Sequence, residues 1–307
     1  MRYSKILVAP LPHISVIVPT YNRAASLQRL LASLGSLELS DSILAEVIIV
    51  DNGSTDNTGE VLFREQGKRN RFDFRVLKEE TKGKSSALNQ GIGLARGEIF
   101  IMVDDDVVVH DRWMTEHWEC HRVGEFGAVQ GRVLPGVDPQ GRPADPNRLR
   151  EYNIPIVDYG NEIRPIRGFT GTNVSFKRDI VRQVGLFNPR LGPGALGFSE
   201  DTEYSIRMRR AGFKIGYSPG AIVYHELNPE RYGRAYNRRT EYRKGVSRSI
   251  YRQDSIWFKI LPDLMAQCIL YGIYRLLGMA QKAYKTEGRI LKSWGYLSGK
   301  LGSSKSM

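Results

Sequence analysis

Three consecutive aspartates, Asp104, Asp105 and Asp106, directly follow an apolar run at residues 99–103. Adjacent carboxylates repel one another, and their place at the end of an apolar segment adds a cost of desolvation. In an extended chain alternate side chains point the same way, so Asp104 and Asp106 share a face. Two carboxylates on one face suit Mg²⁺ or Mn²⁺, which completes its shell with water and phosphate oxygens. The triplet therefore predicts a divalent-cation site for a phosphorylated ligand; the alternative is a solvated acidic turn.

The chain before these aspartates alternates between predicted strands and helices. Buried strands begin at residues 14, 45, 72 and 99, and helical patterns lie between them, for example at 26–37 and 85–97. This order predicts a mostly parallel sheet covered by helices. In such sheets ligands bind outside the carboxyl ends of the strands. Segments 19–22, 51–54 and 104–106 all fall at such ends, so we expect three polar clusters to converge on one crevice.

The chain after Asp106 is less regular. A helix is expected at 111–124, a strand at 126–136, and a loop-rich stretch at 137–166. A strand and a short helix follow. Residues 189–225 read as a glycine-rich loop, a helix from about Asp201, and two short strands.

Charge is distributed unevenly along the 307 residues, whose net charge is +12. Residues 228–307 hold 16 lysines and arginines against 5 acidic residues, whereas residues 1–227 hold 29 against 28. A neutral body with a cationic tail predicts an anionic partner for the tail. The two cysteines, Cys120 and Cys268, lie far apart, which argues against a disulfide framework and fits a reducing compartment.

The tail carries a helical pattern at residues 255–285. Its polar residues recur every four positions and leave most of the helix apolar: Lys259, Asp263, Gln267, Tyr271 and Arg275. With the surrounding cations, this pattern favours a helix in a membrane interface, and we expect an anionic membrane contact through 255–292. Packing against the catalytic domain or a dimer partner is the alternative. No uncharged apolar run reaches the roughly 20 residues that span a bilayer, so no spanning helix is expected.

Four segments resemble, in order, the successive motifs of family 2 glycosyltransferases. They are VIVPTYNR (16–23), VIIVDNGSTD (47–56), KGKSSALNQGIGLARGEIFIMVDDDV (82–107) and GFSEDTEYSIRMRRAGFKIGYSPGAIVYH (197–225). The resemblance covers roughly residues 14–245. It implies the GT-A fold of the α/β class, with a Rossmann-like, mostly parallel central sheet flanked by helices.

The resemblance also implies how the chain divides. We expect residues 1–227 to form a GT-A catalytic domain, with a nucleotide-binding half at about 14–110 and an acceptor half at about 111–227. Residues 228–307 are expected to form a basic, helical C-terminal extension.

The matched motifs imply a nucleotide site and a metal site. The positions that match nucleotide contacts are Pro19, Thr20, Tyr21, Asp51, Lys84, Asp104 and Asp105. Asp51 could instead cap a turn, and Lys84 could be a solvated lysine at a helix start. The positions that match metal ligands are Asp106, Asp104 and His225. A lone histidine such as His225 is more often structural, so that alternative stays open.

Glu200 and Asp201 match the family's Glu-Asp motif. The resemblance implies that Asp201 accepts the proton of the acceptor hydroxyl, because an alcohol is a poor nucleophile near neutral pH. A metal is needed because the departing diphosphate gathers negative charge. A base on one face and a leaving group on the other imply inversion at the anomeric carbon. The alternative is that these acidic residues only stabilise the first turn of a helix.

The expected function is transfer of a sugar from a UDP-, GDP- or dTDP-sugar to a saccharide or lipid-linked acceptor, in polysaccharide or cell-surface glycan synthesis. A sugar nucleotidyltransferase is the alternative, but residues 19–26 lack the glycine-rich loop of that class. No zinc-finger spacing or aromatic RNA motif supports a nucleic-acid partner. We expect a cytoplasmic protein, peripheral on the inner face of the plasma membrane.

Overall fold

The computed structural model describes residues 11–40, 42–68, 71–145 and 155–303. Nine strands of this part form one sheet in the order β3-β2-β1-β4-β8-β6-β9-β5, and β7 pairs with β9. The strands are β1 (Ile14–Thr20), β2 (Ala45–Asp51), β3 (Asp73–Lys78), β4 (Ile99–Val103), β5 (Val107–Val109), β6 (Ala128–Pro135), β7 (Arg164–Ile166), β8 (Asn173–Lys177) and β9 (Ile215–His225). The helices are α1 (Ala24–Gly35), α2 (Thr58–Gln66), α3 (Lys84–Leu94), α4 (Trp113–Val123), α5 (Arg178–Val184), α6 (Glu200–Arg210), α7 (Arg234–Tyr251), α8 (Leu261–Leu276) and α9 (Ala280–Ser303).

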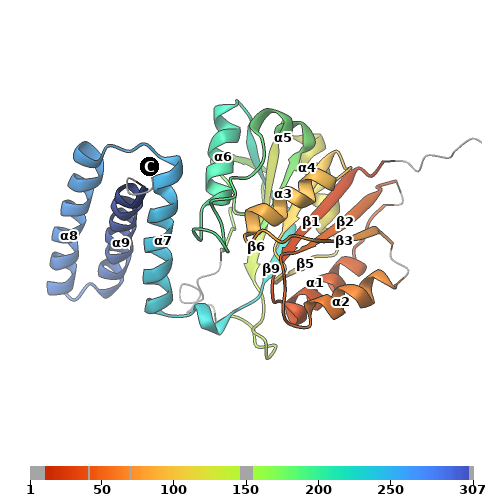
Figure 1. Ribbon diagram of the computed structural model, residues 1–307, viewed down its shortest axis with the longest axis horizontal. Coiled ribbons are helices and arrows are strands. Elements are labelled where there is room, and N and C mark those ends of the chain that lie inside the picture. The colour runs from red at the N-terminus through yellow and green to blue at the C-terminus, as the bar shows by residue number, and fades with distance from the viewer. Residues whose placement is uncertain (1–10, 41, 69–70, 146–154, 304–307) are drawn as a thin grey trace, which may run out of the picture.

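The sheet is mixed and mostly parallel, which confirms the predicted fold class. Strands β3, β2, β1 and β4 pair in parallel and form the N-terminal half of the sheet. Strand β8 runs antiparallel between β4 and β6, and β6 pairs in parallel with β9. The antiparallel strand therefore joins two halves into one continuous sheet (Figure 1).

Helices cover both faces of the sheet and give three layers. Alternate residues of β1 pack on opposite faces: Val16 and Val18 lie in one core cluster with Leu30 of α1, and Ile17 lies in another with Leu88 of α3. Helices α1, α2 and α4 contribute to the first cluster, whereas α3, α5 and α6 contribute to the second. Because the central strands are buried on both faces, they read as unbroken apolar runs.

Strand β9 differs from the prediction of two short strands before His225. It is a single strand, and its register against β6 shifts between Gly131 and Arg132. The Pro219–Gly220 pair looks like a turn in the sequence, but an irregularity in the ladder absorbs it without ending the strand. The strand is close-packed here, since a Cβ on Gly131 would lie 2.4 Å from the carbonyl oxygen of Ala221.

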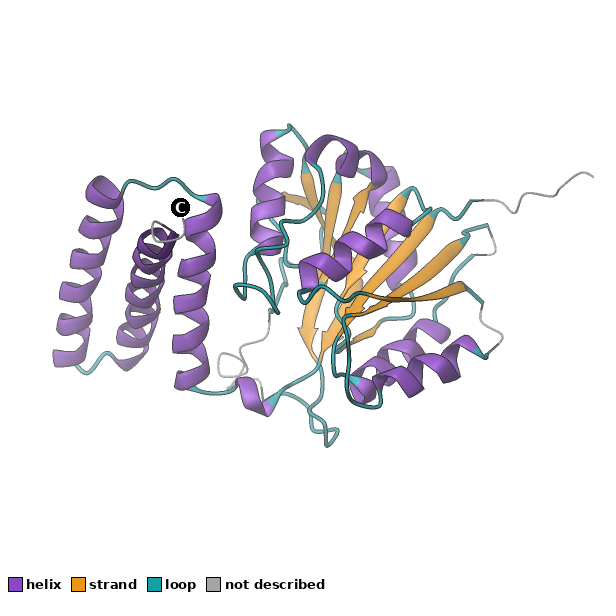
Figure 2. Cartoon of the chain, viewed as in Figure 1, coloured by secondary structure: helices purple, strands orange, loops and turns teal. Residues whose placement is uncertain are grey.

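Residues beyond β9 form a group of three helices beside the sheet (Figure 2). Helices α7 and α9 approach backbone to backbone, because a Cβ on Gly245 would lie 2.0 Å from the carbonyl oxygen of Lys292. A Cβ on Gly295 would likewise lie 2.1 Å from that of Tyr242. The helix expected over 255–285 is in fact interrupted, since α8 ends at Leu276 and α9 begins at Ala280.

The segment Ile256–Leu276, a π-helical turn followed by α8, is long and apolar enough to cross a membrane by length and composition, and 6% of its most apolar window is buried. The expectation was made for uncharged apolar runs, and it did not cover this segment. It required a run without charges, whereas this helix holds Lys259, Asp263 and Arg275 at four-residue spacing. Such spacing confines the charges to one side and leaves the rest of the helix apolar.

The packing around Gly131 predicts a site at which one methyl group destabilises the fold. Gly131→Ala places a Cβ against Ala221 and the side-chain amide of Asn173, and we expect a loss of about 1–3 kcal/mol in the free energy of unfolding. Gly59→Ala on α2 is the control, because no atom lies within 4 Å of its added Cβ. Urea unfolding measures both; equal stability of the two variants would contradict the packing described here.

Candidate active site

The carboxyl ends of the parallel strands bring the predicted polar segments together. Thr20 ends β1, and its hydroxyl donates a 2.7 Å hydrogen bond to Oδ2 of Asp105. The Thr172 hydroxyl, from the loop before β8, donates a 3.0 Å hydrogen bond to Oδ2 of Asp104. Residues far apart in the chain therefore hold the aspartate triplet at the edge where β1 and β4 end.

Asp104, Asp106 and His225 offer ligand atoms that all lie within 4.8 Å of one another. The Nε2 atom of His225 is 3.5 Å from Oδ1 of Asp106, and its Nδ1 is 2.8 Å from the carbonyl oxygen of Glu226. A carbonyl can only accept, so Nδ1 carries a hydrogen, and Nε2 is the ring nitrogen that faces Asp106 and could bind a cation there. Two carboxylates and one oriented imidazole form a donor set that fits a divalent cation.

Asp106 is held as a carboxylate by surrounding cations. Burial raises its pKa, but His225, Arg231 and Arg23 outweigh burial and hold the pKa below its usual range. An Nη2 atom of Arg231 lies 3.3 Å from its Oδ2, and one of Arg23 lies 3.8 Å away. The carboxylate is therefore ionised at neutral pH and able to bind a cation.

Asp105 differs from its neighbours. Burial and the charge of Asp106 raise the pKa of Asp105 to about 7, against the opposing effect of the Thr20 hydrogen bond. Its hydrogen bond to Thr20 gives it a partner of its own. Asp105 and Asp106 lie in a turn, so the extended chain from which the shared face of Asp104 and Asp106 was predicted is not present there.

Lys84 begins α3 and connects the aspartates to the start of α6. Its ammonium contacts the Asp104 carboxylate and lies 3.8 Å from Oε1 of Glu200. Burial would lower the pKa of Lys84, but Asp104 and Glu200 raise it above its usual value. The Lys84 side chain is only 15% exposed and is held as an ion-paired cation, so the alternative of a solvated lysine is wrong.

Glu200 and Asp201 open α6 and have different surroundings. Glu200 is buried, and burial together with the charge of Asp201 raises its pKa to about 7, although Lys84 opposes the shift. Asp201 is partly exposed, and its Oδ2 accepts a 3.0 Å hydrogen bond from the amide of Gly171. Glu200 is thus tied to Lys84, whereas Asp201 is oriented by the loop that also supplies Thr172.

A cavity of about 1190 Å³ joins these groups. Nearly all the predicted site residues line it: Pro19, Thr20, Tyr21, Lys84, Asp104, Asp105, Asp106, Glu200, Asp201 and His225. Asp51 is outside the lining, and its Oδ1 accepts a 2.9 Å hydrogen bond from the amide of Ser54. The turn-capping role is therefore present at Asp51, and its neighbour Asn52 lines the cavity instead.

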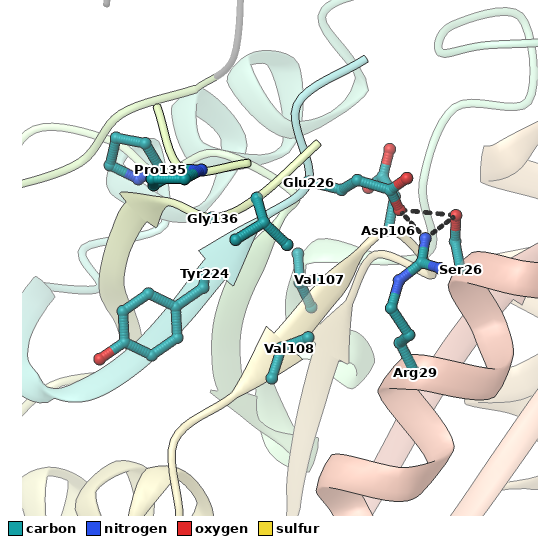
Figure 3. A pocket seen from close by; sticks show the side chains of 11 residues that line it. Ser26, Arg29, Asp106, Val107, Val108, Pro135, Gly136, Tyr224 and Glu226 are labelled. Carbon is teal, nitrogen blue, oxygen red and sulfur yellow. Dashed lines mark hydrogen bonds and ion pairs between the residues drawn. The ribbon is translucent and has the colours of Figure 1, made fainter. Parts of the chain in front are cut away.

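A second cavity, of about 340 Å³, lies on the other side of Asp106 (Figure 3). Its walls are mainly apolar, with Val107, Val108 and Tyr224 among them. Glu226 accepts hydrogen bonds from Ser26 and Arg29 beside it. Because this cavity lacks Lys84, Glu200 and Asp201, we place the chemistry in the larger one.

Sequence reasoning missed several residues at the larger cavity. Arg23 and Arg231 contact Asp106, and Thr172 contacts Asp104. Arg23 is the last residue of the first motif and lies just beyond the end of β1, so its position was a usable signal. Arg231 lies after β9 and carries no such signal. Helix α7 also lines the cavity, for example with Arg243 and Tyr251.

The sequence pattern of the family described as "Glycosyl transferase family 2" matches residues 15–185, more than half of the chain. The chain belongs to this family. The match confirms the predicted family and the glycosyltransferase class of enzyme, and it decides against the nucleotidyltransferase alternative.

Curated relatives are similar at moderate identity. A poly-beta-1,6-N-acetyl-D-glucosamine synthase of Staphylococcus epidermidis is 27% identical over 84% of this chain and 60% of its own length. An N-acetylglucosaminyltransferase of Azorhizobium caulinodans is 27% identical over 82% of this chain and 63% of its own. The chain therefore spans less than two thirds of the length of these relatives.

Solved structures share the fold at low identity. A mannosyltransferase from Pyrobaculum calidifontis, PcManGT, in complex with GDP-Man and Mn²⁺, superposes with a TM-score of 0.60 and 17% identity. The match covers 96% of this chain and 76% of that one. GalNAc-T7 with UDP, GalNAc and Mn²⁺ gives a TM-score of 0.58 over 81% of this chain and 53% of its own. These likenesses show the GT-A fold.

The ligand cluster predicts that metal binding depends on Asp106. Asp106→Asn removes one charge from the donor set, so we expect Mn²⁺ affinity, measured by calorimetry, to fall at least about tenfold. Asp111→Asn is the control, because this aspartate is close in sequence but outside the cluster. Unchanged Mn²⁺ affinity in Asp106→Asn would contradict the assignment of this site.

Proposed function

We propose that this chain transfers a sugar from a nucleotide-sugar donor to a hydroxyl group of a saccharide or lipid-linked acceptor, with inversion at the anomeric carbon. One observation carries the proposal: the cluster of Asp104, Asp106 and His225 lines the same cavity as the carboxylate of Asp201. A cation site for a diphosphate and a base for an alcohol are the two requirements of a single displacement.

The donor is assigned to the side of the cavity that Asp104, Asp106 and His225 form. When bound there, Mg²⁺ or Mn²⁺ would neutralise charge that develops on the departing diphosphate. Arg23 and Arg231 lie beside Asp106 and can contact the same phosphates. Thr20 and Tyr21, at the end of β1, and Asn52, after β2, line the region where the nucleoside would lie.

The acceptor is assigned to the side of the cavity formed by α6. Asp201 accepts the proton of the attacking hydroxyl on its partly exposed carboxylate, while the Gly171 amide fixes its orientation. Glu200 and Lys84 act as positioning residues, since their contact links the start of α6 to Asp104. The base and the donor site are thereby kept at a fixed separation, which favours displacement over unproductive binding.

The names of the relatives and of the solved structures support a choice of donor to test first. PcManGT is solved with GDP-Man and GalNAc-T7 with UDP, and two relatives are named for N-acetylglucosamine. We therefore propose UDP-N-acetylglucosamine as the first donor to test, with GDP- and dTDP-sugars after it. A role in polysaccharide or cell-surface glycan synthesis is proposed on the same relatives.

The proposed base gives a direct test. Asp201→Asn keeps a side chain of the same shape but removes the proton acceptor, so we expect sugar transfer to fall by about 10²–10⁴-fold. Binding of UDP with Mn²⁺, which is measured as an increase in the melting temperature, should be unchanged. Asp179→Asn, an exposed aspartate on α5, is the control. Full transfer activity in Asp201→Asn would remove Asp201 as the base.

We also propose that α8 contacts an anionic membrane surface and places the protein at the cytoplasmic face of the plasma membrane. The apolar side of the segment Ile256–Leu276 points outward: Phe258 of the π-helical turn is 90% exposed, and on α8 Leu276 is 89% and Met265 67% exposed. On its polar side Tyr271 hydrogen-bonds Arg234 of α7, whereas Asp263 and Arg275 are exposed. A helix with this orientation exposes an apolar surface that water does not favour and lipid does.

The proposed membrane contact gives a flotation test. The wild-type protein should float with vesicles that contain phosphatidylserine, and the double variant Phe258→Glu, Ile269→Glu should stay in the bottom fraction, because two buried charges oppose insertion. Phe63→Glu is the control, since Phe63 is 78% exposed on α2, outside the extension. Flotation of the double variant to the same extent would contradict the proposal.

A further inference from the structure

Helices α7 and α9 close one side of the larger cavity with three cationic side chains, Arg243, Lys244 and Lys292. Lys244 donates a 2.7 Å hydrogen bond to Glu241. Within the described residues, no ion pair is formed by the Arg243 guanidinium or by the Lys292 ammonium. This cationic wall, defined as Arg243, Lys244 and Lys292, therefore carries more positive charge than its neighbours neutralise.

The cationic wall lies on the side of the cavity where α6 begins. The Cδ and Nε atoms of Arg243 lie 3.5 Å from the position of a Cβ on Gly197, in the loop that leads into Asp201. The side chains of Tyr251 on α7 and Ser199 on the same loop are hydrogen-bonded. Ser199 adopts a positive φ of 75°, so α7 contacts a constrained turn directly before the proposed base.

The donor's phosphates have separate cationic partners. Arg23 and Arg231 contact Asp106, at the proposed metal site. Arg243 instead contacts the loop before Glu200, and in the described part of the chain it forms no ion pair with the aspartate triplet. The larger cavity therefore has two groups of cations in its wall: one lies beside the aspartate triplet, and the other lies near the start of α6.

The cationic wall is fixed in place by the close packing of its helices. The backbone of Lys292 touches Gly245, the residue after Lys244, so the two lysines lie at the point where α7 and α9 meet. Burial lowers the pKa of Lys292, and Lys244 and Arg248 lower it further against the opposing charge of Glu241. Crowded cations of this kind are stabilised by a bound anion.

We infer that Arg243, Lys244 and Lys292 bind a phosphate group carried by the acceptor and thereby hold the acceptor hydroxyl beside Asp201. This inference rests on the proposed function. A phosphate fits better than a carboxylate, because it carries up to two charges and three acceptor oxygens, and the wall offers one fork-shaped guanidinium and two ammonium groups. The phosphate can belong to a lipid-linked acceptor or to a soluble sugar or polyol phosphate.

The test measures binding of inorganic phosphate by calorimetry, with Mg²⁺ and saturating UDP present so that the donor side is filled. The wild-type protein should bind one phosphate. Arg243→Gln, Lys292→Met should weaken that binding at least about tenfold, because two charge-assisted contacts are lost. Lys285→Gln, Arg289→Met is the matched control: it removes two exposed cations of α9 outside the cavity lining and should bind phosphate like the wild type.

Equal phosphate affinity in all three proteins would overturn the inference. Arg243→Gln alone is also measured, since Arg243 is exposed and its replacement spares the packing of α7 on α9. If UDP fails to bind, the proposed donor site is wrong. The phosphate affinities of the two double variants can still be compared without UDP, so the inference is tested separately. Competition by dodecyl phosphate and by glycerol 1-phosphate then separates the sources, because a lipid-linked acceptor predicts tighter binding of the alkyl ester.

Discussion

The electrostatic balance around the aspartate triplet determines how the rest of the site is built. Buried adjacent carboxylates are tolerated only where cations or hydrogen-bond donors compensate them. Here Lys84 compensates Asp104, and Arg23, Arg231 and His225 compensate Asp106. These partners come from α3, from the end of β1 and from the segment after β9, so the charge balance itself joins the two halves of the catalytic domain.

Lys84 has a central place in that balance. It contacts Asp104 on the side assigned to the donor and approaches Glu200 on the side assigned to the acceptor. This largely buried ammonium therefore links the two sides through charge, in surroundings where such interactions are stronger than in water. The loop of Gly171 and Thr172 makes a second connection, because the Gly171 amide donates a hydrogen bond to Asp201 and the Thr172 hydroxyl donates one to Asp104. The metal site and the proposed base are therefore held by two independent connections.

The C-terminal extension forms part of the wall of the larger cavity. Helix α7 lines the larger cavity along much of its length, from Tyr236 to Tyr251, and α9 reaches it through Lys292. Glycines bring α7 and α9 into backbone contact, so this wall is rigid. Helix α8 lies beside α9 (Figure 1). Several of its apolar side chains are exposed. One extension thus combines a polar surface toward the cavity with an apolar surface toward the exterior.

Several elements of the fold could be predicted from local sequence. The apolar runs before Thr20, Asp51 and Asp104 specify buried parallel strands, and the rule that ligands meet strand ends places those residues at one edge. The two strands expected before His225 were wrong because Pro219 and Gly220 are local turn signals, whereas the partner strand β6 keeps β9 continuous across an irregular register. The uninterrupted helix over 255–285 was wrong because Gly278 adopts a positive φ and separates α8 from α9.

The sequence by itself determined the order of strands and helices, the carboxylates at the strand ends and the pairing of Glu200 with Asp201, because these follow from local patterns and motif spacing. Only the tertiary structure decided that Asp104, Asp106 and His225 meet, that Lys84 is buried between Asp104 and Glu200, and that α7 faces the cavity. It also decided that the apolar side of α8 faces outward. The physical reason is that most of these contacts join residues far apart in the chain, about a hundred positions or more for His225 with the aspartates and for Lys84 with Glu200, and the packing of the whole sheet and extension selects the partners.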